Sequence, residues 1–393
     1  MLNHRFDTLA KLLCEYGYHT TGFCNNPLLG VLNNGLKRGF ETFYNYCGAF
    51  PSVPEWTNPL PKPLSQIWKW YTQQLRKLSY PIQNAFAHSD ILFQLSLNPK
   101  VVPFWSKLAN FKGNTATSIR DTKYFLESVE SDTQPHFVFL NLMETHLPYS
   151  PPDTFINKFA PYFSESYEAR TFMRRYNAET FRWLKPLPKP LPELHHNMLN
   201  DMYDAEANYQ DHLLAGLLEY LAGVENTMVI IVADHGEGIG EHDFMGHSFV
   251  AYQELVHVPL IIKFAEGRAV GKRITETVST RRLFHTALHA AQIPFLDETA
   301  SRPAVEVKPF SLSQTVKGRD PEQGVVFSEA YPPANLLNMM KKRNPELVAQ
   351  FHCDISRRAV YQRAHKLARI DGVQDELFVL DSDPGERINI LVS

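Results

Sequence analysis

The sequence predicts an α/β fold: a doubly wound, mostly parallel sheet flanked by helices, with a small antiparallel subdomain at its carboxyl end. Two continuous apolar runs, at 137–140 and 228–233, are typical of strands that helices cover on both faces. Segments of helical periodicity alternate with such runs. After about residue 300 the pattern changes to short segments with tight turns. We therefore expect an α/β core over residues 1–300 and a small α+β subdomain over 301–393.

The amino-terminal half alternates helices and strands around irregular excursions. Residues 51–110 are rich in proline, tryptophan and tyrosine without a clean period, so we expect an irregular helical insertion there. A second polar excursion, at 160–196, contains KPLPKPLPEL, which favours an extended polyproline conformation at the surface. The regular elements expected are a helix at 6–16, a strand at 18–24, a turn at 25–30, a helix at 117–128 and a strand at 135–143.

The strongest helix signal in the chain lies at 197–222 and ends at Gly223. The dipeptide Asp371-Gly372 indicates a hairpin near the carboxyl end. The other elements expected in this half are strands at 227–234 and 256–264, a helix at 281–293, and short strands at 325–330, 358–370 and 376–381.

Composition excludes several classes of protein. The formal charge of −3 over 393 residues, with basic residues scattered rather than clustered, gives no sign of a nucleic-acid partner. Four cysteines without paired spacing favour free thiols in a reducing compartment. No apolar run approaches the ~20 residues of a bilayer span, and the first residues form no signal-peptide core. As written, the chain is expected to be cytoplasmic.

The densest group of chemically active residues is VADHGEGIGEHDFMGHS, at 232–248. Asp234 and His235 follow a buried strand directly, and an oxygen and a nitrogen ligand together suit a divalent cation, with zinc or manganese favoured over calcium or magnesium. A helix-capping aspartate beside a surface histidine is the alternative. Glycines at 236, 238 and 240 would let the backbone approach a ligand closely.

Two further histidines lie on this loop. His247 is twelve residues beyond His235, far enough for the loop to fold back and for the ring to donate to an anionic oxygen or a leaving group. His242 is expected as a solvated loop side chain. Neither a zincin helix nor a phosphate-binding loop fits, because the spacing, the glycines and the missing Gly-Lys-Ser/Thr ending exclude both.

His146 follows the other buried strand, in the loop THLPY. Alone, a His-x-Pro turn is more often structural than catalytic. Ligand sites in open parallel sheets gather beyond the carboxyl ends of strands, however, and both THLPY and ADHGE occupy that position. His146 is therefore predicted to contact a tetrahedral oxyanion.

Several ordered segments resemble the sulfatase family of the alkaline-phosphatase superfamily. The THLPY and ADHGE blocks together are strongly specific for that superfamily. The segments that carry the resemblance are TLAKLLCEYGYHTTGFCNNP, LKRGFETF, FVFLNLMETHLPYSPP, YDAEANYQD, TMVIIVADHGEGIGEHDFMGH, YQELVHVPLII and ELFVLDSDPGERINIL.

The resemblance implies an alkaline-phosphatase-like fold and a metal-dependent hydrolase of sulfate esters, acting on a small-molecule or glycan ester. It implies that Asp234 and His235 are two ligands of one divalent metal, with calcium, manganese, zinc and magnesium not distinguished. It also implies that His146 and His247 contact the charged oxygens of the ester or its leaving group.

The chain departs from the family pattern at its start. The family begins with a strand that ends in acidic metal ligands, followed by a C/S-x-P-S-R-like nucleophile motif that can carry a formylglycine, and neither is found here. We therefore expect an amino-terminally truncated chain that is inactive as written. The alternatives are a phosphodiester or phosphonate hydrolase, a phosphoethanolamine-transferase-like enzyme, and a non-catalytic pseudoenzyme that binds an anionic ligand.

Overall fold

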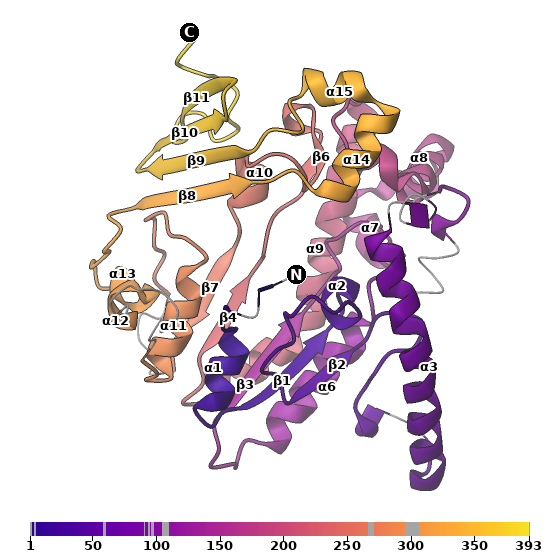
Figure 1. Cartoon of the computed structure of the whole chain (residues 1–393), viewed down its shortest axis with the longest axis vertical. Coiled ribbons are helices and arrows are strands. Elements are labelled where there is room, and N and C mark those ends of the chain that lie inside the picture. Colours follow the sequence, from indigo (N-terminus) through magenta and orange to yellow (C-terminus); the bar gives the residue numbers. More distant parts are fainter. Residues whose placement is uncertain are drawn as a thin grey trace. The chain divides into compact units, whose positions relative to one another are not determined.

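The computed structural model describes residues 2–3, 5–57, 60–89, 91–92, 95, 98–103, 110–265, 271–294 and 306–392 (Figure 1). These residues form two compact units, one of residues 1–182 and 192–223 and the other of residues 183–191 and 224–393. The domain boundary predicted between residues 300 and 301 lies outside the described residues and stays a prediction. Each unit is described by itself.

The first unit contains a parallel three-stranded sheet in the order β2-β1-β3. His19 pairs with His136 and Cys24 with Asn141, so β1 and β3 start and end in register. The elements are α1 (Leu9–Glu15), β1 (His19–Cys24), α2 (Pro27–Gly30), β2 (Thr42–Asn45), α3 (Lys62–His88), α6 (Thr115–Ser128), β3 (His136–Asn141), α7 (Asp153–Phe159), α8 (Tyr167–Ala178) and α9 (Glu193–Gly223).

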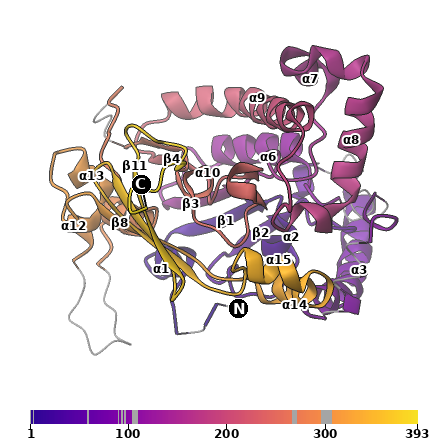
Figure 2. The ribbon, with the colours of Figure 1, turned by 90° about the horizontal axis from the view of Figure 1, so that it is seen from above.

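Alternation along β3 explains its unbroken apolar run. Val138 and Leu140 pack against a buried cluster that includes Phe23 of β1 and Phe125 of α6. Phe137 and its neighbour Phe139 lie against the ring of Phe40. Both faces of this strand therefore carry apolar contacts, and α6 lies between the sheet and α9 (Figure 2).

The insertion at 51–110 is more regular than predicted, because α3 is a 27-residue helix. Polar side chains of this helix contact residues 45–55. Lys69 pairs with Glu55, and Arg76 donates to the carbonyl of Pro51 at 2.7 Å. The Asn45 amide donates to the Tyr80 hydroxyl at 3.1 Å. The helix contains Trp68, Trp70, Tyr71 and Pro81, the residue types that made the segment look irregular in sequence.

The second unit contains the turn that carries most of the predicted site. Its strands β4 (Val229–Val232) and β7 (Leu260–Lys263) form an antiparallel pair, and β5 (Gly238–Ile239) pairs with β6 (Met245–Gly246). A four-stranded antiparallel sheet has the order β11-β10-β9-β8. The remaining elements that matter below are α10 (Gln253–Val256), α11 (Arg282–Ala290), β8 (Val325–Ala330), α15 (Pro345–Gln350), β9 (Arg357–Gln362), β10 (His365–Ile370) and β11 (Gln374–Val379).

Most predicted elements are present, but β4, predicted as a buried strand of the parallel sheet, pairs antiparallel with β7 and is exposed at Val232. The KPLPKPLPEL segment was expected at the surface and is exposed at 188–190 and 192–194. Only Pro186 and Leu187 are buried, and the N–H of Leu187 donates to the carbonyl of Asp243 at 2.7 Å. The four cysteines are free, as predicted. None of the helices in the described part of the chain combines the length and the apolar character needed to cross a bilayer.

Candidate active site

Asp234 and His235 form an exposed turn two residues beyond the end of β4. The Asp234 side chain is 80% exposed, and its Oδ2 lies 3.8 Å from Nε2 of His235. The backbone N–H of His235 also donates to Oδ1 of Asp234, at 3.1 Å. One carboxylate oxygen and one ring nitrogen therefore lie close together beyond the end of the strand.

A backbone carbonyl fixes the tautomer of His235. Nδ1 of the ring lies 2.8 Å from the carbonyl oxygen of Gly236, which can only accept, so Nδ1 carries the proton. The lone pair of a neutral ring is then on Nε2, the nitrogen that faces Asp234. This is the arrangement in which a histidine ligates a metal while its other nitrogen is held by the protein.

His247 returns to this turn, and a carboxylate holds it. Its ring stacks on that of His235, with centroids 4.3 Å apart, and its Nδ1 lies 3.3 Å from Oε1 of Glu237. Burial disfavours the charged ring, but the hydrogen bond and the negative charge of Glu237 outweigh it, so the pKa of His247 lies above its ordinary value. With Nδ1 donating to Glu237, Nε2 of the charged ring is the nitrogen that can donate to an anion.

The glycines of the loop allow neighbouring backbone segments to approach closely. A Cβ at Gly236 would lie 1.9 Å from the carbonyl oxygen of Glu254, and a Cβ at Gly238 would lie 2.9 Å from that of Gly246. The N–H of Gly236 donates to the carbonyl of Leu255 at 2.8 Å. The expected close approach is therefore made to α10 and to β6, in a loop that is folded on itself.

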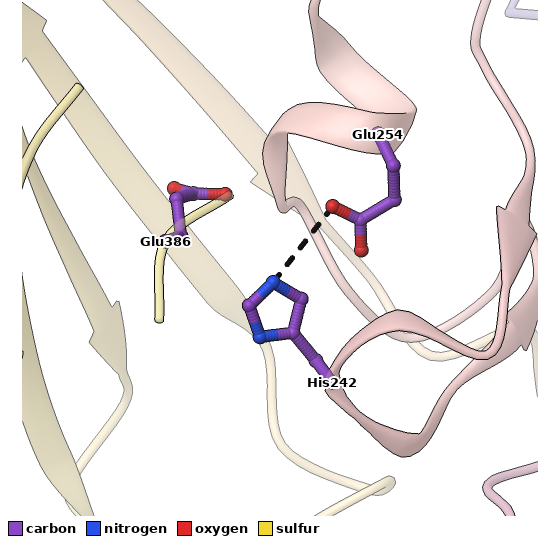
Figure 3. Close-up of side chains that lie close together, drawn as sticks. All are labelled: His242, Glu254 and Glu386. Atoms are coloured by element: carbon purple, nitrogen blue, oxygen red, sulfur yellow. Dashed lines mark ion pairs between the residues drawn. The ribbon is translucent and has the colours of Figure 1, made fainter. Parts of the chain in front are cut away.

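His242 is not the solvated side chain that the sequence predicts. Its ring stacks on Tyr252 at 3.7 Å, and burial lowers its pKa. Together with Glu254 and Glu386 it offers donor atoms that all lie within 4.8 Å of one another, a group that could hold a metal ion (Figure 3). The ammonium of Lys366 contacts Glu386 at 2.5 Å, so a cation already neutralises part of this group.

His146 belongs to the first unit and lies five residues beyond the end of β3. Its Nδ1 is 2.6 Å from the carbonyl of Leu147, so Nδ1 carries the proton and donates it to that oxygen. The loop is anchored by Lys112, which donates to the Glu144 carbonyl at 2.6 Å and to Glu206 at 2.8 Å. Glu206 in turn accepts from the Ser150 N–H at 2.7 Å.

The structure brings Asp234, His235 and His247 together within one unit, while His146 is positioned within the other. Sequence reasoning missed the supporting residues. Glu237 could have been found, because it lies inside the motif. Lys112, Glu206, Glu254, Lys366 and Glu386 are far apart in the sequence, and no spacing rule connects them.

Comparison with known families decides the assignment. The model of the family described as "Sulfatase" matches residues 2–293, which include all four predicted site residues. The chain belongs to the sulfatase family.

Relatives and solved structures agree with this membership. Dog (Canis lupus familiaris) arylsulfatase K is 23% identical over 401 residues, covering 89% of this chain and 66% of that protein. A Delta 4,5-hexuronate-2-O-sulfatase of Bacteroides thetaiotaomicron is 27% identical over 191 residues, covering 46% of this chain and 33% of the relative. The phosphonate monoester hydrolase of Agrobacterium radiobacter has the same fold, with a TM-score of 0.60 at 18% identity, covering 100% of this chain and 77% of that one.

Proteins of the sulfatase family use a divalent metal, and the turn after β4 fits half of such a site. Asp234 is open to solvent, and His235 presents an unprotonated nitrogen beside it. Two protein ligands are fewer than the three or four of a tight site. The chemistry of the two residues therefore fits part of such a ligand set and does not fill it.

Proposed function

We propose that the full-length protein is a metal-dependent hydrolase of sulfate esters. The observation that carries this proposal is the convergence of the Asp234 carboxylate and Nε2 of His235 at 3.8 Å within the matched family region. The chain spans 66% of the length of arylsulfatase K and 33% of that of the hexuronate sulfatase, so the proposal concerns the whole protein.

Asp234 and His235 would hold one divalent ion, and the imidazole ligand favours zinc or manganese over calcium or magnesium. A bound ion would neutralise the charge of the ester oxygens and polarise the bond that breaks. The carboxylate and imidazole supply one negative charge between them, and the carbonyl of Gly236 keeps the ring in the ligating tautomer.

His247 and His146 are proposed to bind the ester's oxygens. The raised pKa of His247 favours the charged ring, which can donate from Nε2 to an anionic oxygen. Nδ1 of His146 donates its proton in a hydrogen bond to the carbonyl of Leu147. It can therefore donate from Nε2 only when the ring is charged, and accepts a proton there when neutral.

The proposed substrate is a sulfated glycan or a small sulfate ester, because one relative is named a hexuronate 2-O-sulfatase. The full-length protein, loaded in turn with zinc, manganese, calcium and magnesium, is assayed side by side on a nitrophenyl sulfate and on nitrophenyl phosphodiester and phosphonate esters. We expect the sulfate to be preferred and Asp234→Asn to reduce turnover at least about 100-fold, as for the loss of a central transition-state contact. Equal turnover by Asp234→Asn would remove the proposal.

A second candidate is a phosphonate or phosphodiester hydrolase. Histidine at position 235 favours it, because an imidazole ligand suits zinc or manganese, and the fold is shared with a phosphonate monoester hydrolase. The same assay separates the two candidates: faster turnover of the phosphonate or phosphodiester would select this one.

A further inference from the structure

The carboxyl-terminal segment of the second unit reaches back to the loop that carries the proposed metal ligands. Glu386 follows the last strand of the chain and lies outside the region that the family model matches. Its Oε2 accepts from the backbone N–H of Gln253 at 2.6 Å, and its Oε1 is paired with Lys366 of β10 at 2.5 Å. Both side chains of this pair are fully buried.

Lys366 extends the contact to the adjoining backbone. Its Nζ donates to the carbonyl of Ala251 at 2.6 Å and lies 5.6 Å from the centre of the Tyr252 ring. Three consecutive residues, 251 to 253, are therefore held by one buried ion pair: a carbonyl by the ammonium, a ring by the same cation, and an N–H by the carboxylate.

The held segment touches the ligand loop at two points. Tyr252 stacks on the ring of His242, and His242 also faces Glu254 at 3.9 Å (Figure 3). The following helix, α10, accepts the N–H of Gly236 through the carbonyl of Leu255, at 2.8 Å. Gly236 is the residue directly after His235, and its carbonyl sets the tautomer of that ring.

We infer that Lys366 and Glu386 are positioning residues, which hold residues 251–256 so that Gly236 presents Asp234 and His235 in ligating geometry. The inference rests on the proposed function for the identity of the ligands. The ion pair, the backbone contacts and Gly236 form one continuous chain of contacts, and a displacement of α10 would move the carbonyl that fills the space beside Gly236.

His242, Glu254 and Glu386 could instead bind a metal ion, with no positioning role for Lys366 and Glu386. The ammonium of Lys366 argues against it, because a divalent ion bound to Glu386 would lie beside a buried positive charge. The cation of this group is therefore the lysine, whose proposed role is to position residues 251–256.

The test measures Mn²⁺ affinity of the full-length protein by electron paramagnetic resonance, together with hydrogen exchange at the amides of Gly236 and Gln253. Glu386→Gln is compared with Glu329→Gln, which alters an exposed carboxylate in β8 of the sheet that also contains Lys366. We expect Glu386→Gln to speed exchange at both amides and to weaken Mn²⁺ binding about tenfold, a typical effect of a residue that orients a ligand. Glu329→Gln should change neither.

A purely structural role would lower the melting temperature and leave the Mn²⁺ affinity of the folded protein unchanged, which would overturn the inference. If Glu386→Gln does not fold, Glu386→Asp keeps the charge but shortens the reach to Gln253, and the same two readouts apply. Asp234→Asn distinguishes the two proposals: if it leaves Mn²⁺ binding intact, the proposed metal site fails, whereas unchanged exchange at Gly236 in the Glu386 variants overturns the positioning role.

Discussion

At the scale of single residues, Gly236 carries the tightest steric requirement in the site. Gly236→Ala would place a methyl group 1.9 Å from the carbonyl oxygen of Glu254, so the turn or α10 must move. We expect a loss of at least about 2 kcal/mol in the free energy of unfolding, measured by urea denaturation.

Gly216 supplies the matched control for that substitution. It lies inside α9, and a Cβ there would meet no atom within 4 Å. Gly216→Ala should therefore stabilise the protein by about 0.5–1 kcal/mol, since alanine restricts the unfolded chain and suits a helix. Equal effects of the two substitutions would contradict the packing described for Gly236.

At the scale of elements, the loop after β3 depends on a buried ion pair. Lys112→Met would leave Glu206, which is 1% exposed, without its cation, and we expect a loss of about 3 kcal/mol in the free energy of unfolding. The Lys112→Met/Glu206→Gln double variant should recover most of this loss, because it removes both charges and keeps an oxygen to accept from Ser150. A double variant as unstable as the single one would show that the pair is not the cause.

The elements also show which features the sequence could predict. Strands β1, β3 and β4 and helices α6 and α9 were predictable, because their apolar runs and periods are unbroken and their ends carry turn residues. Asp234, His235, His146 and His247 were predicted as site residues from their places at strand ends and from the family resemblance, and these roles stay predictions. Contacts such as Lys112 with Glu206 and Lys366 with Glu386 join residues far apart in the chain, so they follow from tertiary structure alone.

Helix α3 was not predicted as a regular helix. Its lysines, glutamines and leucines favour a helix, but its polar side chains contact the unit and many apolar ones, among them Leu64, Trp68 and Leu78, are exposed. These apolar residues nevertheless recur at helical spacing, as at positions 64, 67, 68, 71, 75, 78 and 82, so their period could have identified the helix from the sequence.

At the scale of the whole molecule, a buried carboxyl group links folding to pH. Burial raises the pKa of Glu254 from 4.5 to about 7; the charges of Glu241 and Glu386 act in the same direction, and Lys366 partly opposes them. His242 also faces it at 3.9 Å, and the Tyr361 hydroxyl interacts with its charge. Because the pKa is lower in the unfolded chain, the folded protein holds the extra proton between these two values.

The stabilisation from Glu254 is therefore complete below its unfolded pKa and is lost as the pH rises through about 7. Glu254→Gln stays neutral at every pH, so we expect its free energy of unfolding to fall less steeply than that of the wild type, by roughly 1–3 kcal/mol between about pH 5 and pH 8. Urea denaturation at several pH values measures this difference. Glu346→Gln, at an exposed position in the first turn of α15, should reproduce the wild-type slope. A parallel slope for Glu254→Gln would mean that Glu254 is ionised throughout, and the group around Lys366 would then hold two charged carboxylates at neutral pH.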